Sequence, residues 1–207
     1  MRDMDYFETI CIKHGAALRL DYHLARMRNT FAQFDSPHGA KAEAALLKFL
    51  AKVGRNPQAD RQRLRWLYSL SGEAECQLLP YTPRIVRQLQ VVEVAAFDYA
   101  LKAVNRSALD ALFALRQSAD DVLIVVDGQI TDTTIANVAL FDGQRWVTPR
   151  PLLPGTHRAS LIEQGIIHEC SIGIEMLPRF SLLRLFNAML EWGEVEISID
   201  QLICPRH

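Results

Sequence analysis

Apolar and polar positions in the first third of the chain follow two different periods. Residues 7–13 roughly alternate and predict a strand, Gly15 supplies a turn, and residues 18–20 predict a second short strand. Asp21 follows as the expected N-cap of a helix that ends near Phe34. Four apolar residues of this helix recur at helical spacing and predict one buried face: Leu24, Met27, Phe31 and Phe34.

The next stretch predicts a loop, a helix and three strands. Residues 35–39 are typical of a loop, and residues 40–53, rich in Ala, Leu and Lys, predict a helix. Three strand-like runs follow: 64–70, 75–79 and 88–95. We expect them to form a meander with one polar face, which makes the first half α+β.

The second half alternates short strands, turns and helices. A helix is expected from about Ser107 to Arg116, a buried strand over 122–126, and a hairpin turn at Asp127-Gly128. Residues 130–141 predict irregular or extended chain. Residues 146–148 lead into a proline-rich loop that ends at Gly155. The remaining expected elements are a helix capped by Thr156 and ending before Gly165, and strands within 166–172 and 194–199.

Length and composition fit a soluble globular protein with a sizeable core. The chain has 207 residues, of which 49% are hydrophobic, enough for one domain or two small lobes. We place the lobe boundary near Phe97–Asp98, which gives a smaller α+β lobe at 1–97 and a larger lobe at 98–207.

Charge and cysteine usage exclude several classes of protein. The 23 Lys and Arg residues nearly cancel the 24 Asp and Glu residues, so the basic surplus of a nucleic-acid binder is absent. The alternating Arg61, Arg63 and Arg65 are interpreted as the solvent face of a strand. No apolar run reaches the roughly 18 residues that span a membrane, and the N-terminus does not resemble a signal peptide. The four cysteines are scattered without C-x-x-C spacing, so we expect reduced thiols, no metal site and a cytoplasmic protein.

Two basic side chains are candidates for chemistry. Lys102 is expected between a strand and a helix among apolar neighbours, where a lysine loses charge stabilisation and its amine becomes nucleophilic. Arg26 lies one turn into a predicted helix and could direct its guanidinium at a phosphate. Each has an ordinary alternative, a solvated surface side chain.

Two further stretches carry anionic or anion-binding groups. Residues 130–137 contain Asp132, whose carboxylate could pair with a protonated pyridine nitrogen, although Asp, Thr and Asn also satisfy backbone groups in plain turns. Residues 153–158 open a helix, where free N–H groups and the helix dipole favour an anion. Gly155 would allow the backbone to approach it closely. A nucleophilic lysine, a carboxylate, an arginine and a helix N-terminus together indicate pyridoxal 5′-phosphate.

With these motifs, the chain resembles the class IV, or fold type IV, pyridoxal-phosphate enzymes. That family includes branched-chain and D-amino acid aminotransferases and 4-amino-4-deoxychorismate lyase. Six stretches match its motifs in order over nearly the whole chain: Phe7-Glu8-Thr9, His23 to Arg26, Lys102 to Arg106, Thr131 to Asn137, Thr148-Pro149, and Leu153 to Arg158. The resemblance implies a two-lobed α+β fold like that of D-amino acid aminotransferase, shortened at the N-terminus.

The resemblance also implies roles for individual residues. Lys102 is the Schiff-base lysine and proton carrier, and Thr9 helps to protonate or orient the leaving portion of the substrate. Asp132 takes the ring-nitrogen role, and Arg26 contacts the phosphate together with the backbone N–H groups of Thr156 and His157. Cofactor contacts are also implied for Ala136, Asn137, Leu153, Gly155, Asn187 and Ala188. The pair Asn187-Ala188 resembles the lyase version of the last phosphate-contacting segment, where aminotransferases tend to carry threonines.

The chain departs from the family in three respects. One is that the tyrosine often found in the family shortly after the lysine is absent, and Ser107 stands near that position. The family usually has Glu where this chain has Asp132, which is shorter by one methylene and must therefore sit closer to the ring or act through water. The N-terminal hairpin that precedes the Phe-Glu-Thr strand in full-length members is missing from this sequence. Part of the substrate pocket is therefore expected to differ, or to come from another subunit.

The leading functional hypothesis is a lyase that converts 4-amino-4-deoxychorismate to 4-aminobenzoate and pyruvate in folate synthesis. The alternatives are an aminotransferase acting on D-amino or branched-chain amino acids, and a catalytically silent homologue that binds the cofactor or serves as a scaffold. The resemblance also implies a small amino-acid-like substrate and a homodimer. It leaves open whether an aminodeoxychorismate synthase partner docks.

Overall fold

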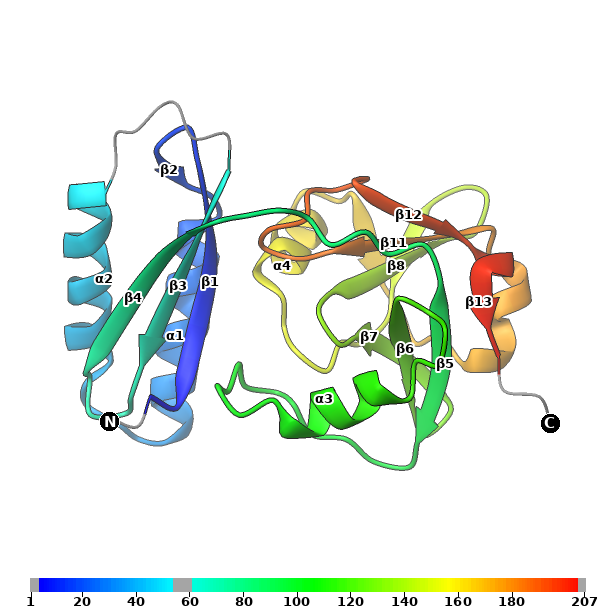
Figure 1. Ribbon diagram of the computed structural model, residues 1–207, viewed down its shortest axis with the longest axis horizontal. Coiled ribbons are helices and arrows are strands. Elements are labelled where there is room, and N and C mark those ends of the chain that lie inside the picture. The colour runs from blue at the N-terminus through cyan, green and yellow to red at the C-terminus, as the bar shows by residue number, and fades with distance from the viewer. Residues whose placement is uncertain (1–3, 54–60, 205–207) are drawn as a thin grey trace. The chain divides into compact units, whose positions relative to one another are not determined.

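The computed structural model describes residues 4–53 and 61–204. The chain forms two compact units, which we call unit 1, Met1–Pro83 with Leu101–Asn105, and unit 2, Arg84–Ala100 with Arg106–His207. Each unit has its own sheet and helices, so the expected α+β class is confirmed (Figure 1). The lobes 1–97 and 98–207 stay a prediction about domain organisation. None of the helices in the described ranges combines the length and apolar character needed to cross a membrane.

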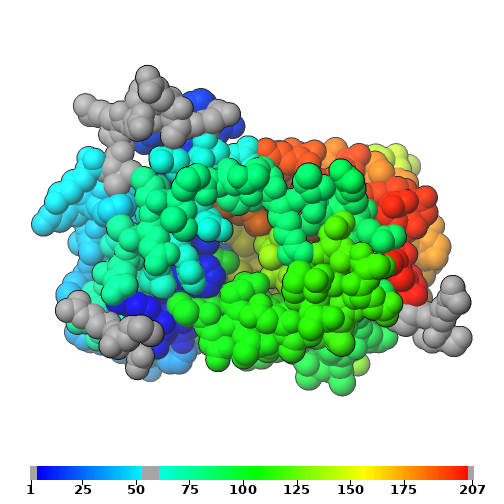
Figure 2. Space-filling model, viewed as in Figure 1, coloured from blue at the N-terminus to red at the C-terminus, as the bar shows by residue number. Residues whose placement is uncertain are grey.

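Unit 1 contains a four-stranded antiparallel sheet with two helices. In sheet order the strands are β2 (Ala16–Ala17), β1 (Tyr6–Lys13), β3 (Gln62–Tyr68) and β4 (Ala74–Pro80). The helices are α1 (Leu20–Gln33) and α2 (Gly39–Val53). Side chains alternate between the faces of a strand, and one face of β1 and β3 forms a core with both helices. The members of this core include Ile10, Ile12, Leu24, Met27, Phe31, Leu46, Leu64, Trp66 and Tyr68. In Figure 2 the side chains of α2 and β4, cyan to blue-green, lie at the surface.

A segment from later in the chain completes the sheet of unit 1. The backbone N–H of Phe7 donates to the carbonyl of Lys102 (3.0 Å), and the N–H of Val104 donates to the carbonyl of Asp5 (2.8 Å). Tyr6 and Ala103 form an antiparallel bridge between these bonds. Lys102 is therefore fixed beside β1 by its own backbone.

Unit 2 contains a nine-stranded mixed sheet. Its main path runs β10 (Ile167–Glu169), β9 (Trp146–Thr148), β8 (Asn137–Phe141), β7 (Gln129–Thr133), β6 (Asp121–Val126), β5 (Leu89–Val94) and β13 (Leu202–Ile203), while β11 (Leu182–Phe186) pairs with both β8 and β12 (Val195–Ser198). Its helices are α3 (Ser107–Ala114), α4 (Thr156–Glu163) and the 3-10 turns η1 (Ile174–Arg179) and η2 (Ile199–Gln201). Strand β6 is buried along almost its whole length, as its unbroken apolar run predicts.

The structure corrects both expected helix caps and the strand before α1. The short strand lies at Ala16–Ala17 rather than 18–20, and α1 already begins at Leu20. Its N-cap is Arg19, in the left-handed conformation (φ 55°), so Asp21 lies in the first turn. The N-cap of α4 is Gly155, and Thr156 is the first helical residue, one position too late for its hydroxyl to cap.

Other expected elements are also revised. The meander is wrong beyond its first hairpin, because β5 leaves the sheet of unit 1 and pairs in parallel with β6. Residues 130–141, expected to be irregular or extended, prove extended, since they form most of β7 and β8. Phe34 is 46% exposed at the end of α1 rather than part of its buried face. On β3, Arg63 and Arg65 are half-buried rather than solvated.

Candidate functional site

Asp132 of β7 joins three segments of unit 2. One carboxylate oxygen accepts a hydrogen bond from the side-chain amide of Asn137 (2.8 Å), at the start of β8. The other accepts from the backbone N–H groups of Leu152 (2.9 Å) and Leu153 (3.0 Å). A carboxylate offers about four acceptor positions, so Asp132 retains capacity for one further donor.

The protonation of Asp132 is finely balanced. Burial raises the pKa of this carboxyl to about 6, although the N–H donors of Leu153, Asn137 and Leu152 and the charge of Arg158 act in the opposite direction. A positively charged donor at the remaining acceptor position would favour the ionised form further. Asp132 is therefore chemically suited to pair with a protonated ring nitrogen.

Gly155 lies against Asn137 so closely that any larger residue would collide with the Asn137 side chain. A Cβ atom at Gly155 would lie 1.8 Å from the side-chain oxygen of Asn137. The amide of Asn137 also donates to the carbonyl of Leu153 (3.1 Å), so the loop before α4 is fixed to β8. This contact gives Gly155 a steric role that the sequence expectation of close backbone approach did not specify.

The start of α4 is anchored to a second turn of unit 2. Nδ1 of His157 lies 2.9 Å from the carbonyl oxygen of Asn187 and 3.1 Å from that of Leu190. The side chain of Asn187 donates to the carbonyl of Ile135 (2.9 Å) and accepts from the N–H groups of Met189 and Leu190. The turn that contains Asn187 and Ala188 is thus held against both α4 and the β7–β8 turn.

The N-terminus of α4 suits an anion such as a phosphate. The first N–H groups of any helix lack intrahelical partners and point out of its N-terminal end. In α4, which the structure describes completely, the N-cap is glycine, no side chain caps the helix, and the first turn has no acidic residue. Behind this turn, buried Arg158 donates to Thr148 and Pro149 and pairs with Glu169, which fixes the helix to its surroundings.

In unit 1, a buried carboxylate binds two cationic or protonatable side chains of α1. Glu8 of β1 is fully buried, and its Oε1 accepts a hydrogen bond from Nε of Arg26 (2.9 Å). Its Oε2 accepts from Nη2 of Arg26 and lies 2.6 Å from Nδ1 of His23, which is also fully buried. The network fixes the orientation of the Arg26 guanidinium, whose side chain is 12% exposed.

Opposing effects set the charges in this network. Burial would raise the pKa of Glu8, but Arg26 and His23 outweigh it and hold this pKa at about 2. Burial lowers the pKa of His23, assisted by the charges of Arg26 and Lys102 and opposed by Glu8. At neutral pH the network is therefore a carboxylate paired with a guanidinium, with His23 neutral.

Lys102 lies beside strand β1 of unit 1, and Thr9 belongs to that strand. The Lys102 amine is 4.8 Å from the centre of the Phe7 ring, and Phe7 is buried. Thr9 is two residues further along β1, on the same face of the strand as Phe7. The amine thus has the apolar neighbour that the sequence predicted for it.

The expected site residues therefore fall into two groups, one in each unit. Unit 2 holds most of the expected cofactor contacts: Asp132, Ala136, Asn137, Leu153, Gly155, Thr156, His157, Asn187 and Ala188. Of these, the hydrogen bonds above involve Asp132, Asn137, Leu153, His157 and Asn187. Unit 1 holds Thr9, Arg26 and Lys102. Sequence reasoning gave no role to Glu8 and His23. The sequence did contain one signal. Glu8 falls at a core-facing position of an alternating strand, and His23 and Arg26 lie three residues apart on the helix that follows.

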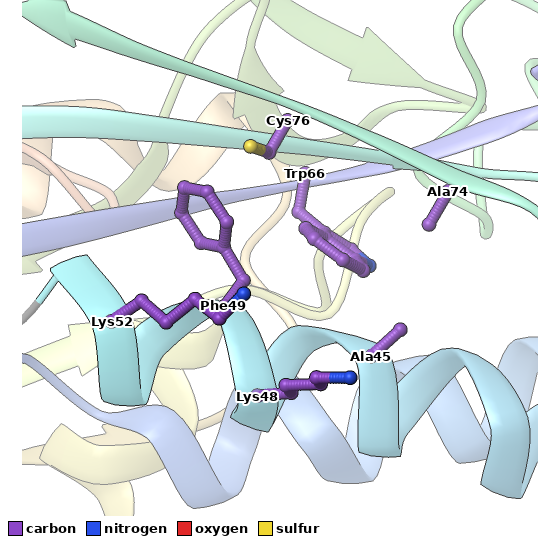
Figure 3. Close-up of a pocket in the computed structure, with 7 residues that line it drawn as sticks. All are labelled: Ala45, Lys48, Phe49, Lys52, Trp66, Ala74 and Cys76. Carbon is purple, nitrogen blue, oxygen red and sulfur yellow. The ribbon is translucent and has the colours of Figure 1, made fainter.

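A separate pocket lies on the helix-covered side of unit 1. It has a volume of about 260 Å³, and Figure 3 shows its lining side chains on α2, β3 and β4: Ala45, Lys48, Phe49, Lys52, Trp66, Ala74 and Cys76. None of these is an expected site residue, and all but Trp66 are only partly buried or exposed. We interpret this pocket as imperfect packing of α2 on the sheet rather than as a reaction site.

Comparisons with known proteins give consistent matches. A family model described as "Amino-transferase class IV" matches residues 5–197. A Schizosaccharomyces pombe protein named "Putative aminodeoxychorismate lyase" is 31% identical over 91% of this chain and 87% of its own. The crystal structure of a "putative 4-amino-4-deoxychorismate lyase" from Haemophilus somnus is 29% identical, with a TM-score of 0.83 over 93% of this chain and 100% of that chain. A "Putative amino-acid aminotransferase" from Mesorhizobium loti is 25% identical, with a TM-score of 0.80 over 97% and 100%.

Proposed function

Because the chain belongs to the class IV aminotransferase family, whose members are pyridoxal-phosphate enzymes, we propose that it is an aminodeoxychorismate lyase. In this reaction 4-amino-4-deoxychorismate gives 4-aminobenzoate and pyruvate. The observation that carries the proposal is Asn187. Its side chain donates to the Ile135 carbonyl of the β7–β8 turn, and its backbone carbonyl lies 2.9 Å from Nδ1 of His157 in α4. Aminotransferases of this family tend to carry threonines at this position.

We assign the cofactor contacts as follows. The first-turn N–H groups of α4 and the Arg26 guanidinium bind the phosphate, since both are suited to an anion. Asp132 keeps the ring nitrogen protonated, for which its remaining acceptor position and its pKa of about 6 fit. When bound, pyridoxal phosphate supplies an electron sink that stabilises negative charge at the substrate Cα.

Lys102 has two tasks in this proposal. Its Nζ would hold the cofactor, and the same amine would serve as the general base for the substrate Cα proton. The Phe7 ring, whose centre lies 4.8 Å from Nζ, packs against the amine and holds it beside β1. Thr9, on the same face of β1, orients or protonates the leaving portion of the substrate.

The lysine assignment is tested by chemical trapping. Borohydride reduction of the yellow holoenzyme, followed by peptide mass spectrometry, should find the cofactor attached to Lys102. Lys102→Ala should lose both the visible band and the label, whereas Lys48→Ala, at an exposed lysine of α2, should keep both. A label on any other lysine contradicts the assignment.

The reaction is tested without an amino acceptor. Pyruvate released from aminodeoxychorismate in the absence of any keto acid supports the lyase. Activity that requires a keto acid favours the second candidate, an aminotransferase, which the similarity to the Mesorhizobium loti protein supports. A protein that ignores pyridoxal phosphate would be a silent homologue. A homodimer, a docked synthase partner, a role in folate synthesis and a cytoplasmic location are further parts of the proposal.

A further inference from the structure

Asp121 is a buried carboxylate to which the proposed reaction gives no role. It is the first residue of β6 and is fully buried. Its Oδ1 accepts hydrogen bonds from the hydroxyl of Thr134 (2.7 Å) and from the backbone N–H of Val122 (2.8 Å). Its Oδ2 lies 3.8 Å from Nη1 of Arg84 and has no hydrogen-bond partner within residues 4–53 and 61–204. Because burying a carboxylate with an unpaired oxygen is costly, Asp121 is a candidate for a role beyond packing.

Thr134, the partner of Asp121, lies in the turn between β7 and β8, two residues after Asp132. Its hydroxyl donates to Asp121, and its carbonyl accepts from Nη2 of Arg106 (2.7 Å). Thr134 is therefore held from two sides. Beyond the turn, Asn137 pairs with Asp132 across the ladder and donates to its carboxylate. The turn that Asp121 holds thus connects Asp132 to one of its own hydrogen-bond donors.

The pairing of β7 with β6 is irregular at Asp132. Regular pairing resumes on both sides of the irregularity, in the pairs Val125–Ile130 and Leu123–Thr133. Between them, Thr131 and Asp132 of β7 lie opposite the single residue Ile124 of β6. Such a bulge interrupts the backbone ladder and re-aims a side chain. The hydroxyl of Thr131 fixes one side of it by donating to the carbonyl of Ile124 (2.8 Å), and the bond between Asp121 and Thr134 fixes the other side.

We propose that Asp121 is a positioning residue, which acts through Thr134 to direct the Asp132 carboxylate at the ring nitrogen of pyridoxal phosphate. The inference rests on the proposed function, because it takes the ring-nitrogen role of Asp132 from there. It applies to the lyase and to the aminotransferase alike, since both would use that nitrogen. A hydrogen bond weakens steeply as its geometry departs from linear. A turn released by the loss of Asp121 would therefore weaken the contact between Asp132 and the ring.

The test compares pyridoxal phosphate with its 1-deaza analogue, in which a C–H group replaces the ring nitrogen. Absorbance titration of the cofactor-free protein measures the affinity for each compound. The ratio of the two affinities reports the ring-nitrogen contact, because the two compounds share every other contact. We expect the wild type to prefer pyridoxal phosphate by about tenfold to a hundredfold, as for a charge-assisted hydrogen bond. Asp132→Asn should lose most of this preference.

Removing either end of the bond between Asp121 and Thr134 should have the same effect. Thr134→Val and Asp121→Ala should each lower the preference for pyridoxal phosphate by about threefold or more, whereas Thr134→Ser, which keeps the hydroxyl, should retain it. In the Asp132→Asn background, Thr134→Val should change the preference no further, because its effect passes through Asp132. The control is Ser36→Ala, which removes a hydroxyl hydrogen bond of the same length to the Leu70 carbonyl of unit 1 (2.7 Å). It should leave the preference unchanged.

A purely structural role for the bond gives a different result. Thr134→Val would then weaken the binding of both compounds equally and leave their ratio unchanged, which overturns the inference. A change of the ratio that persists in the Asp132→Asn background overturns it as well. If Thr134→Val does not fold, Thr134→Ala measured against Thr134→Ser decides, because these two variants differ by the hydroxyl alone.

Failure of this inference is distinct from failure of the proposed function. A wild type that prefers pyridoxal phosphate, together with a Thr134→Val variant that keeps the whole preference, overturns the role of Asp121 alone. A wild type without any preference overturns the ring-nitrogen role of Asp132, and the inference with it. A protein that binds neither compound overturns the proposed function as a whole.

Discussion

Glu8 and Arg26 form a two-point ion pair in the interior of unit 1, with the guanidinium of α1 laid against the carboxylate of β1. The pair ties the first strand to the helix that follows it. It also sets the direction of the arginine proposed to bind phosphate. The two effects can be separated by experiment.

Removing the charge of Glu8 should be costly. Glu8→Gln keeps the shape but leaves Arg26 without its counter-ion, and breaking a buried pair in this way costs about 3–5 kcal/mol. Urea unfolding measures the change. The matched control is Glu43→Gln, which removes the exposed partner of Arg28 and should change the free energy of unfolding by less than about 1 kcal/mol. A Glu8→Gln loss as small as that of the control would contradict the buried-pair interpretation.

The same network predicts a dependence of stability on pH. The pKa of His23 is lowered in the folded protein from its ordinary value of 6.5, so below about pH 6.5 the unfolded chain binds a proton that the folded chain does not. Stability from this group is present above pH 6.5 and is lost as pH falls through the folded pKa. His23→Gln should remove this component. Urea midpoints between pH 8 and pH 5 that fall equally in both proteins would count against it.

At lower pH a second loss is expected from Glu8. Its pKa is held at about 2, below its ordinary value of 4.5. Its contribution is therefore present above pH 4.5 and is lost as pH falls toward 2. Glu8→Gln should show a flatter dependence of stability on pH in this range than the wild type.

Asp132 predicts the opposite sign. Its pKa of about 6 lies above the ordinary 3.8, so without cofactor its contribution to stability is present below pH 3.8 and is lost as pH rises through about 6. Asp132→Asn should remove this loss in the cofactor-free protein. Saturation with pyridoxal phosphate should diminish it in the wild type, because a cationic ring nitrogen favours the ionised carboxylate. A cofactor that leaves the wild-type profile unchanged argues against the ring-nitrogen role.

Gly155→Ala should destabilise unit 2. The backbone of Gly155 (φ −73°, ψ 139°) suits any residue, so the expected loss of about 1–3 kcal/mol comes from the collision with Asn137. Gly155→Ala combined with Asn137→Ala removes that collision. The combined variant should therefore lose less stability than the two single losses added together. Additive losses would show that the contact is not responsible.

Much of this arrangement follows from local sequence. The Ala, Leu and Lys content of residues 40–53 and the turn signal at Asp127-Gly128 depend on neighbouring residues only, and both predictions are confirmed. The spaced motifs also indicated the family correctly. A strand that pairs with its predecessor as a hairpin and a strand that crosses to another sheet can have the same residue pattern. The pairing of β5 with β6 in the second sheet was therefore not predictable. Likewise, the crowding at Gly155 depends on Asn137, a residue distant in sequence, and no local pattern encodes it.

The return of Leu101–Asn105 to the edge of β1 makes unit 1 discontinuous along the gene. A fragment ending at Pro83 would lack the Lys102 carbonyl that accepts from Phe7 and the Val104 N–H that donates to Asp5. It would also lack the lysine itself. Unit 1 therefore cannot be transferred to another protein as one continuous segment. Any split, fusion or domain exchange that retains the Lys102 amine must include residues from two separate stretches of coding sequence.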